Sequence, residues 1–474
     1  MVDVSIAVLA AGKGTRLKLP FPKVLAPIMG KPMLYFVLQA LEEFIFHSKI
    51  KAQVGVVVGH QSELVAQYLA TYKNTTPIKQ AIQKEQKGTA DAVKSYFESI
   101  DGAAVSPLTM VVCGDTPLLT AEIFQKLWTH MQQSPEIDGV AATFKTDRPQ
   151  GYGRIIKNLK NASFIIKEEK DASDEEKKIT EVNASLYLVK TSKLLKFMNQ
   201  LQNNNAAREY YLTDLFQDNF SATTLTFDSD EDFLGVNDQN QLEKVNQVLR
   251  SKKIQHLRSQ GVHVMDSAST FMDWDVVIGE HTTLHPGCIL QEGTRIGKNC
   301  SIGPYAVLKN TKIADGAIIH PFTVSQDAVI GVQAEIGPMA RLRPGTELAQ
   351  KVKIGNFVEV KKSQLGIGAK VSHLSYIGDA VIGEKANIGC GFITCNYDGK
   401  NKHQTFIGAG TFIGSDCQAI APIKIGAHCF VAAGSTITED MPEGSFAIAR
   451  SKQTTRVELA KRFLKSDGSD KVNS

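Results

Sequence analysis

The sequence has no long apolar run, little net charge and no positive residue among its first four. None of its uninterrupted apolar stretches approaches the roughly 20 residues that a membrane-spanning helix needs. A formal net charge of +4 over 474 residues is too small to favour nucleic acid as a partner. Residues 1–4 lack the positive charge of a signal peptide, so the apolar residues 4–11 predict a first strand. We expect a cytoplasmic protein that binds neither membranes nor nucleic acid.

The cysteines are also few, and their spacing is not that of a metal site. The seven form an odd set without any Cys-x-x-Cys pair, which argues against a zinc site or a disulfide framework. Six lie in the second half of the chain, mostly where small apolar side chains would pack. Buried free thiols, typical of a reducing cytosol, are therefore expected.

What the sequence does contain is a six-residue repeat between Ile278 and Ile437, in which an aliphatic residue is very often followed by glycine. This period fits neither a helix nor a strand, but it is typical of a parallel β-helix. Each short strand would supply one inward aliphatic side chain, and the glycine would allow a tight corner. The repeat changes register several times, and each change predicts a bulge or an inserted loop.

The first half instead alternates apolar runs with amphipathic stretches, which predicts an α/β domain with a largely parallel sheet. The predicted strands span residues 4–10, 53–59 and 109–114, and the predicted helices span residues 33–46, 62–72 and 121–132. Residues 238–260 are charged and helix-prone, and Gly261 is a plausible stop. The predicted division is a first domain at 1–237, a linker helix at 238–260 and a β-helix domain at 261–474, with a polar tail from Ser451.

A glycine loop follows the first predicted strand. Residues 12–16 read Gly-Lys-Gly-Thr-Arg, and Pro22-Lys23 comes shortly after. This is neither a P-loop nor the dinucleotide-binding pattern. Glycines nevertheless let backbone N–H groups approach a phosphate, and cations neutralise its charge. The glycines alone would favour only a tight turn, but Arg16 and Lys23 favour an anionic ligand.

Polar residues also interrupt the six-residue repeat. Arg343 and Lys361 are about one 18-residue coil apart and should stack on one face. Stacked cations without nearby acids repel one another unless an anion lies between them. An isolated pair would more simply coat a solvated edge. His373 and Tyr376 follow closely, and a histidine could remove a proton from an attacking amine.

Three segments in order, residues 9–23, 83–90 and 113–118, together resemble the signature of sugar-phosphate nucleotidyltransferases. Further matching segments are residues 151–154, 168–172, 235–237, 394–399, 414–415 and 432–434. The resemblance covers nearly the whole chain. It is closest to the bacterial family that joins an N-acetylglucosamine-1-phosphate uridyltransferase to a glucosamine-1-phosphate N-acetyltransferase. It implies a Rossmann-like nucleotidyltransferase domain and a left-handed β-helix of hexapeptide repeats, assembled as a homotrimer with shared acetyl-transfer sites.

The resemblance also implies two reactions. Acetyl-CoA would acetylate glucosamine 1-phosphate, and the resulting N-acetylglucosamine 1-phosphate would attack UTP with release of pyrophosphate. The product, UDP-N-acetylglucosamine, is a precursor of peptidoglycan and lipopolysaccharide. Arg16 and Lys23 would stabilise the charge that develops, and Asp115 and Asn237 would bind Mg²⁺.

The remaining site residues are implied by the same resemblance. UTP and the sugar would contact Leu9, Ala10, Ala11, Gly12, Lys23, Gln83, Gly88, Thr89, Cys113, Gly114, Asp115, Gly153, Glu168, Asn183 and Asn237. In the β-helix, His373 would be the general base, and glucosamine 1-phosphate would contact Arg343, Lys361, Tyr376 and Asn387. Coenzyme A would contact Cys390, Asn396, Tyr397, Ser415, Ala433 and Arg450.

The chain departs from the family pattern at a few positions. Cys113 and Cys390 stand where tyrosine and alanine are usual, and residues 184–185 are Ala-Ser in place of Thr-Gly. Two other functions fit the same residues. The β-helix could serve assembly alone beside an active nucleotidyltransferase, or the chain could be a sugar-nucleotide sensor without catalysis.

Overall fold

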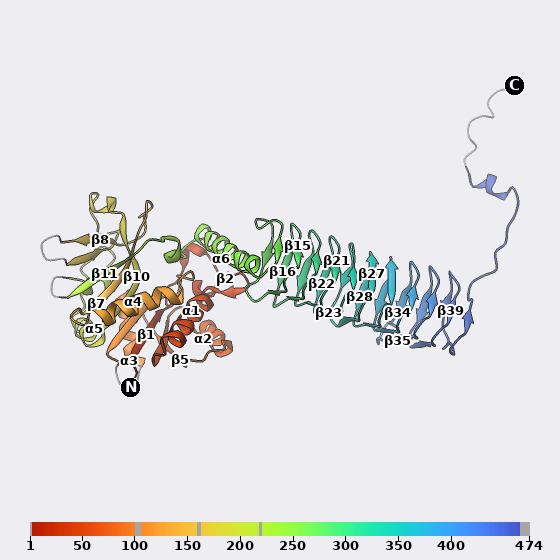
Figure 1. Ribbon diagram of the computed structural model, residues 1–474, viewed down its shortest axis with the longest axis horizontal. Helices are drawn as coiled ribbons and strands as arrows, with labels where there is room; N and C mark the ends of the chain where they lie inside the picture. The colour runs from red at the N-terminus through yellow and green to blue at the C-terminus, as the bar shows by residue number, and fades with distance from the viewer. Residues whose placement is uncertain (1, 100–105, 159–162, 218–219, 465–474) are drawn as a thin grey trace, which may run out of the picture. The chain divides into compact units, whose positions relative to one another are not determined.

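The computed structural model describes residues 2–99, 106–158, 163–217 and 220–464 (Figure 1). The chain divides into two compact units, Met1–Lys253 and Ile254–Ser474. In the described residues, no helix combines the length and the apolar character that crossing a membrane requires. The last ten residues of the predicted polar tail lie outside the described residues.

The first unit is built on a nine-stranded mixed sheet whose main path runs β11-β7-β10-β6-β1-β4-β5. These strands are β1 (Val4–Leu9), β4 (Ala52–Val58), β5 (Ile78–Ile82), β6 (Leu108–Cys113), β7 (Gly139–Lys145), β10 (Glu181–Lys190) and β11 (Ala222–Phe227). The strands β6, β1, β4 and β5 are parallel, whereas β10 runs antiparallel to both of its neighbours. β8 (Arg154–Lys157) and β9 (Phe164–Lys167) form an antiparallel pair that joins the sheet at β10.

Helices cover both faces of this sheet, which is why its central strands are largely apolar (Figure 1). In β1, Val4, Ile6 and Val8 pack into the core that includes α1 and α4, while Ala7 belongs to the opposite core with α3 and α5. The helices are α1 (Met33–Ser48), α2 (Ser62–Thr71), α3 (Thr89–Ser99), α4 (Ala121–Gln133) and α5 (Thr191–Met198). The predicted α/β class is confirmed.

The long helix α6 (Gln239–Ser259) follows the first sheet. It ends at Ser259, and Gly261 follows with a φ of 84°, the left-handed conformation that commonly terminates a helix. The predicted helix at 238–260 is therefore present. The division between the compact units falls inside α6, so the domain limits at 237 and 261 stay a prediction.

The second unit is a left-handed parallel β-helix with three flat sheets, and each coil gives one strand to each sheet (Figure 1). The first sheet contains β12 (His263–Val264), β15 (Thr283–Leu284), β18 (Ser301–Ile302), β21 (Ile318–Ile319), β24 (Glu335–Ile336), β27 (Lys353–Asn356), β30 (Lys370–His373), β33 (Asn387–Ile388), β36 (Phe412–Ile413), β39 (Phe430–Val431) and β41 (Phe446–Ala447). The second contains β13 (Phe271–Met272), β16 (Ile289–Gln291), β19 (Val307–Lys309), β22 (Val324–Gln326), β25 (Arg341–Leu342), β28 (Glu359–Lys361), β31 (Tyr376–Gly378), β34 (Ile393–Cys395), β37 (Gln418–Ile420) and β40 (Thr436–Ile437). The third contains β14 (Val277–Ile278), β17 (Arg295–Ile296), β20 (Lys312–Ile313), β23 (Ala328–Ile330), β26 (Thr346–Leu348), β29 (Gln364–Leu365), β32 (Ala380–Ile382), β35 (Thr405–Ile407) and β38 (Ile423–Ile425).

The periodic aliphatic residues point into this β-helix and stack on one another. Ile278 pairs with Ile296, and both are buried. The register changes have two causes. The coil from Arg295 to its partner Lys312 is one residue shorter than the coil before it, so the prediction of a bulge or an insertion is wrong there. Between β34 and β35, by contrast, residues 396–404 form an inserted loop, as predicted.

Candidate functional site

The glycine loop after β1 is shaped by Gly14. Its φ of 62° is left-handed, and a Cβ added there would lie 2.5 Å from the Cβ of Lys23. Glycine therefore lets the loop pass over Lys23, which begins a short 3-10 helix, η2 (Lys23–Leu25). Arg16 lies in another, η1 (Thr15–Leu17), and its side chain is exposed.

Three residues far apart in the sequence meet at the carboxyl ends of the sheet strands. Lys23 forms a short ion pair with Asp115, and its Nζ also donates a hydrogen bond to Oδ1 of Asn237 at 3.0 Å. The backbones join as well, because the Val236 N–H donates to the Asp115 carbonyl at 2.9 Å. The structure thus brings Lys23, Asp115 and Asn237 together. Among the described residues, no hydrogen bond or ion pair joins Arg16 to them.

This convergence fits the chemistry of a hard cation. A carboxylate and an amide oxygen already share one positive group, the Lys23 ammonium. Mg²⁺ prefers oxygen ligands and usually keeps several waters and substrate oxygens. Over the described ranges, no group of three or more His, Cys, Asp or Glu side chains could hold a metal ion. Asp115 and Asn237 could therefore supply only part of a magnesium shell.

The backbone beside Asp115 lies against the start of the glycine loop. The Gly114 N–H donates to the Leu9 carbonyl at 2.8 Å, and a Cβ at Gly114 would lie 3.1 Å from that oxygen. Ala10 and Ala11 are buried next to it, while Gly12 is exposed. Burial raises the pKa of Cys113 to about 12, so its thiol stays protonated at neutral pH.

The predicted uracil-binding residues form one structured loop after β5. Gln83 is buried, and its Nε2 donates to the Gly88 carbonyl and to Asp91 at 3.1 and 2.7 Å. Gly88 has a φ of 117°, and a Cβ there would lie 2.5 Å from the Tyr210 carbonyl oxygen. The Thr89 hydroxyl accepts the Leu212 N–H at 3.0 Å. Gln83, Gly88 and Thr89 are thus held together.

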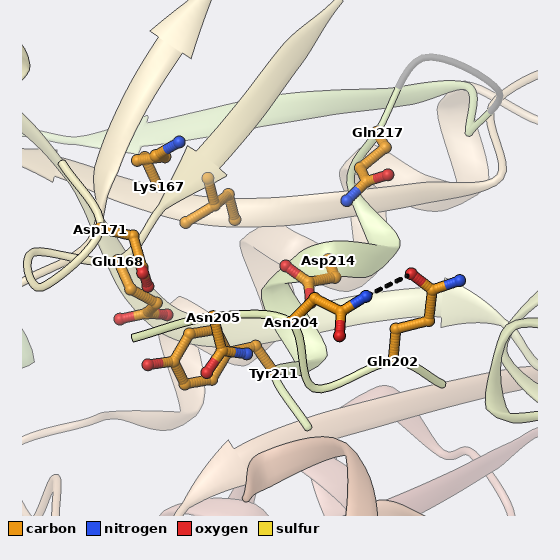
Figure 2. A pocket seen from close by; sticks show the side chains of 10 residues that line it. Lys167, Glu168, Asp171, Gln202, Asn204, Asn205, Tyr211, Asp214 and Gln217 are labelled. Carbon is orange, nitrogen blue, oxygen red and sulfur yellow. Dashed lines mark hydrogen bonds between the residues drawn. The ribbon is translucent and has the colours of Figure 1, made fainter. Parts of the chain in front are cut away.

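Glu168 lines a polar cavity of about 260 Å³ (Figure 2). Burial, followed by the nearby acids Asp171 and Asp214, raises the pKa of Glu168. Thr213 donates its hydroxyl proton to Oε1 of Glu168 at 3.0 Å. The cavity is otherwise lined by Ile166, Lys167, Asp171, Gln202, Asn204, Asn205, Tyr211, Asp214 and Gln217.

Sequence reasoning missed Tyr211 and Thr213, which lie at this cavity or contact Glu168. They belong to the run Tyr-Tyr-Leu-Thr-Asp at residues 210–214, and η4 (Leu212–Leu215) carries Thr213 toward Glu168. The sequence signal that could have revealed them is a pair of polar side chains, Tyr211 and Thr213, next to the apolar Leu212 and Leu215.

Asn183 and Gly153 lie side by side, and some of their hydrogen-bonding groups are occupied by contacts within the fold. The Asn183 N–H donates to the Gly153 carbonyl at 2.9 Å, and its Nδ2 donates to the Tyr187 hydroxyl at 2.6 Å. Ser185, at a position where the family pattern has glycine, has a left-handed φ of 54°. The Asn183 Oδ1 accepts the Ser185 N–H at 3.1 Å, which supports this conformation.

In the β-helix, Arg343 and Lys361 occupy neighbouring positions of adjacent coils, because Leu342 pairs with Val360 just before them. The prediction that these cations lack a nearby acid is wrong. Arg343 Nη1 binds Oε1 of Glu359 at 2.7 Å, and this raises the pKa of Arg343. Tyr376 pairs with Glu359 on the next coil.

A further cation, Lys402, was missed by the sequence analysis. Its pKa is lowered, and the neighbouring Lys361 is the main cause. Lys402 lies in the inserted loop, where Tyr397 forms an antiparallel bridge with it. The loop is tied to the coils, since Asn396 donates to Asp379 at 2.5 Å. Two ammonium groups this close favour an anion between them.

His373 and Asn387 lie on the first sheet, whereas Arg343 follows β25 of the second sheet. His373 is the last residue of β30 and pairs with Asn356, and its side chain is exposed. Asn387 lies in β33 and pairs with Lys370 of β30. Within the described part of the chain, no hydrogen bond or ion pair joins His373 to Arg343 or Lys361.

Four of the predicted coenzyme A residues share one corner of successive coils. The Cys390 carbonyl accepts the Asp416 N–H at 2.7 Å, and the Ser415 carbonyl accepts the Gly434 N–H at 2.8 Å. Arg450 Nη1 then donates to the Ala433 carbonyl at 2.9 Å. All seven cysteines are free, and four of them, Cys288, Cys300, Cys417 and Cys429, are buried.

Comparison with known proteins finds matches in both units. Residues 6–211 match the family "MobA-like NTP transferase domain", residues 272–356 match "GMPPB C-terminal domain", and residues 404–439 match "Bacterial transferase hexapeptide (six repeats)". "Bifunctional protein GlmU" of Geotalea uraniireducens is 41% identical over 96% of this chain and 98% of its own length. The proteins of the same name from Exiguobacterium sp. and Geobacillus sp. are 42% and 40% identical, covering 96% and 98% of this chain and 99% of their own lengths. A solved UDP-glucose pyrophosphorylase complexed with UDP-glucose covers 53% of this chain and 100% of its own, with 15% identity and a TM-score of 0.42.

Proposed function

Because this chain belongs to the bifunctional GlmU family, we propose that it makes UDP-N-acetylglucosamine in two steps at two sites. The β-helix acetylates glucosamine 1-phosphate with acetyl-CoA, and the first unit transfers a uridylyl group from UTP to N-acetylglucosamine 1-phosphate. The observation that carries the proposal is the meeting of Lys23, Asp115 and Asn237 beside a glycine loop. We also propose the limits 1–237, 238–260 and 261–474 for the two domains and their linker, and a cytoplasmic location.

Uridylyl transfer needs positioning and charge neutralisation more than covalent chemistry. An oxygen of the sugar phosphate attacks the α-phosphorus of UTP, and pyrophosphate leaves with the electrons of the broken P–O bond. Asp115 and Asn237 would hold Mg²⁺, which neutralises phosphate oxygens when bound. Lys23 and Arg16 add positive charge where the transition state is most negative. Gln83, Gly88 and Thr89 would orient the base; Gly153, Glu168 and Asn183, with Tyr211 and Thr213, would orient the sugar.

Acetyl transfer needs a base and an anion site. His373 would take a proton from the amine of glucosamine 1-phosphate as the nitrogen attacks the thioester carbonyl, and coenzyme A leaves as the thiol. Arg343, Lys361 and Lys402 would bind the sugar phosphate, with Tyr376 and Asn387 beside it. Cys390, Asn396, Tyr397, Ser415, Ala433 and Arg450 would line the coenzyme A site. The homotrimer is part of the proposal, because no hydrogen bond or ion pair joins His373 to Arg343 or Lys361 in the described part of one chain.

A crossed pair of variants tests the assignment of the two activities. The parent, given glucosamine 1-phosphate, acetyl-CoA, UTP and Mg²⁺, should yield UDP-N-acetylglucosamine by mass spectrometry. His373→Ala should lose about 10²–10⁴-fold in acetyl transfer, the range for a missing general base, and keep uridylyl transfer. Asp115→Ala should lose uridylyl transfer and keep acetyl transfer.

The two alternative functions predict different outcomes. Undiminished acetyl transfer in His373→Ala would refute the base assignment. A parent without any acetyl transfer would support the alternative in which the β-helix serves only oligomer assembly. A parent that binds UTP but releases no pyrophosphate would support the sensor. Thermal melts of both variants should match the parent, which excludes unfolding as the cause of lost activity.

A further inference from the structure

A second cavity, of about 400 Å³, opens beside the glycine loop. It is lined by Lys13, Gly59, His60, Lys84, Glu85 and Gln86. None of these residues has a role in the two reactions as described above. The cavity is open to solvent, and its lining carries two lysines and a histidine that can donate hydrogen bonds to an anion, Lys13, Lys84 and His60.

The order of the strands explains how these residues meet. β1, β4 and β5 are neighbouring parallel strands, so the segments that follow them emerge at the same edge of the sheet. Lys13 follows β1, His60 follows β4, and Lys84 follows β5. The segments are also joined directly, because Gln86 Nε2 donates to the Ala11 carbonyl at 2.8 Å. A Cβ at Gly59 would lie 2.6 Å from the same Nε2, so glycine permits this approach.

The charges of the cavity do not cancel. Glu85 is its one lining carboxylate, and it forms an ion pair with Lys87 at 2.6 Å that lowers the pKa of Glu85. Among the residues that the structure describes, neither Lys13 nor Lys84 has a carboxylate within ion-pairing distance. Uncompensated cations at the rim of an open cavity attract a multiply charged anion.

The position of the cavity indicates which anion it would bind. In-line displacement at phosphorus places the attacking and leaving oxygens on opposite sides. Of the proposed sugar residues, Glu168 directly follows β9 and Asn183 lies in β10, both on the β6 side of β1 in the sheet order. The cavity lies on the other side of β1, between β1, β4 and β5. A leaving group displaced from the glycine loop would depart toward it.

We propose that Lys13, His60 and Lys84 form the docking site of the leaving pyrophosphate, and hence of the β- and γ-phosphates of UTP. The inference rests on the proposed uridylyl transfer. It adds residues that bind the leaving group, separate from those that hold the sugar and the metal ion. Lys84 should contribute chiefly to pyrophosphate affinity, because it lies on the segment farthest from Asp115 in the strand order.

The test is the reverse reaction, in which UDP-N-acetylglucosamine and pyrophosphate give UTP with Mg²⁺. In Lys84→Gln, the KM for pyrophosphate should rise about tenfold, as expected for a lost charge-assisted contact, while the KM for UDP-N-acetylglucosamine stays unchanged. Lys84→Arg should retain the parent KM for pyrophosphate. His60→Asn combined with Lys84→Gln should raise that KM further.

Lys79→Gln is the matched control, because Lys79 is an exposed lysine on β5 that does not line the cavity. Its constants should equal those of the parent. An unchanged KM for pyrophosphate in Lys84→Gln and in the double variant would overturn the docking site while leaving the proposed function intact. A parent that forms no UTP at all would instead refute the uridylyl transfer itself.

Discussion

Glu168, a proposed sugar-binding residue, lowers the stability of the folded state when its carboxyl is ionised. Its carboxyl is half-buried beside Asp171 and Asp214, and these surroundings raise its pKa. A folded state that binds this proton more tightly than the unfolded state loses stability as pH rises above the ordinary glutamate pKa of about 4.3. At neutral pH, Glu168 therefore opposes folding.

Glu168→Gln should accordingly stabilise the first unit at pH 7.5 and change its stability little at pH 4, where the parent carboxyl already holds its proton. The Thr213 hydroxyl can still donate to the amide oxygen. Calorimetric unfolding of the full chain at the two pH values measures the difference. Glu63→Gln, on exposed positions of α2, is the control and should shift neither midpoint. Equal stabilisation at both pH values would contradict the electrostatic cause.

At this scale, the sequence predicted residues that follow strands better than residues that come from loops. Asp115 was predictable because it ends an apolar strand, and ligands of open sheets bind there. Lys402 and Thr213 were not, since only the folded chain brings Lys402 near Lys361 and Thr213 near Glu168, both distant in the sequence. Glu359 was overlooked as a partner for Arg343 because the register places it diagonally on the next coil.

At the scale of elements, the six-residue repeat predicted the inward side chains of the β-helix, since a repeat fixes the same contact on every coil. It could not predict the shortened coils, because losing one corner residue leaves the inward side chains stacked. In the first unit, the antiparallel course of β10 was not predicted either. Its apolar pattern is the same in both directions, and only its pairing with β6 and β7 decides the direction.

The corner glycines are the weakest points of the β-helix toward added volume. A Cβ at Gly303 would lie 2.7 Å from the Ile319 carbonyl oxygen and 2.8 Å from the Pro321 nitrogen, both backbone atoms. Gly303→Ala should therefore cost about 1–3 kcal/mol of unfolding free energy, as overpacking usually does. Denaturant unfolding followed by circular dichroism measures this loss.

Gly444→Ala provides the comparison for that variant. Gly444 has a φ of 70° and nothing within 4 Å of an added Cβ, so only backbone strain opposes the methyl group. The Gly444→Ala variant should lose about 1–2 kcal/mol of unfolding free energy, the usual cost of the left-handed conformation. A Gly303→Ala variant as stable as the parent would show that the corner relaxes to admit the methyl group.

At the scale of the whole molecule, a column of apolar side chains on the β-helix supports the proposed trimer. Five successive coils place a large apolar residue at the same corner, and each is at least 45% exposed: Tyr305, Phe322, Met339, Phe357 and Leu374. Tyr305 and Phe322 stack with ring centroids 5.3 Å apart. A continuous exposed apolar column of this kind marks an interaction surface.

The parent should sediment at about three times its chain mass of 51.7 kDa. Phe357→Asp combined with Leu374→Arg should dissociate it and remove acetyl transfer, while uridylyl transfer remains. Phe46→Asp, at an exposed apolar position on α1, is the control and should leave the mass unchanged. A monomeric parent with full acetyl transfer would refute both the trimer and the shared site.

The stacking of the coils has one more consequence. Every coil pairs with the coil before it and the coil after it, so the solenoid can unfold from its C-terminal coil without disturbing the earlier coils. Arg450 belongs to the outermost turn, next to Ala433. Mild heat or limited proteolysis should thus abolish acetyl transfer before uridylyl transfer is lost.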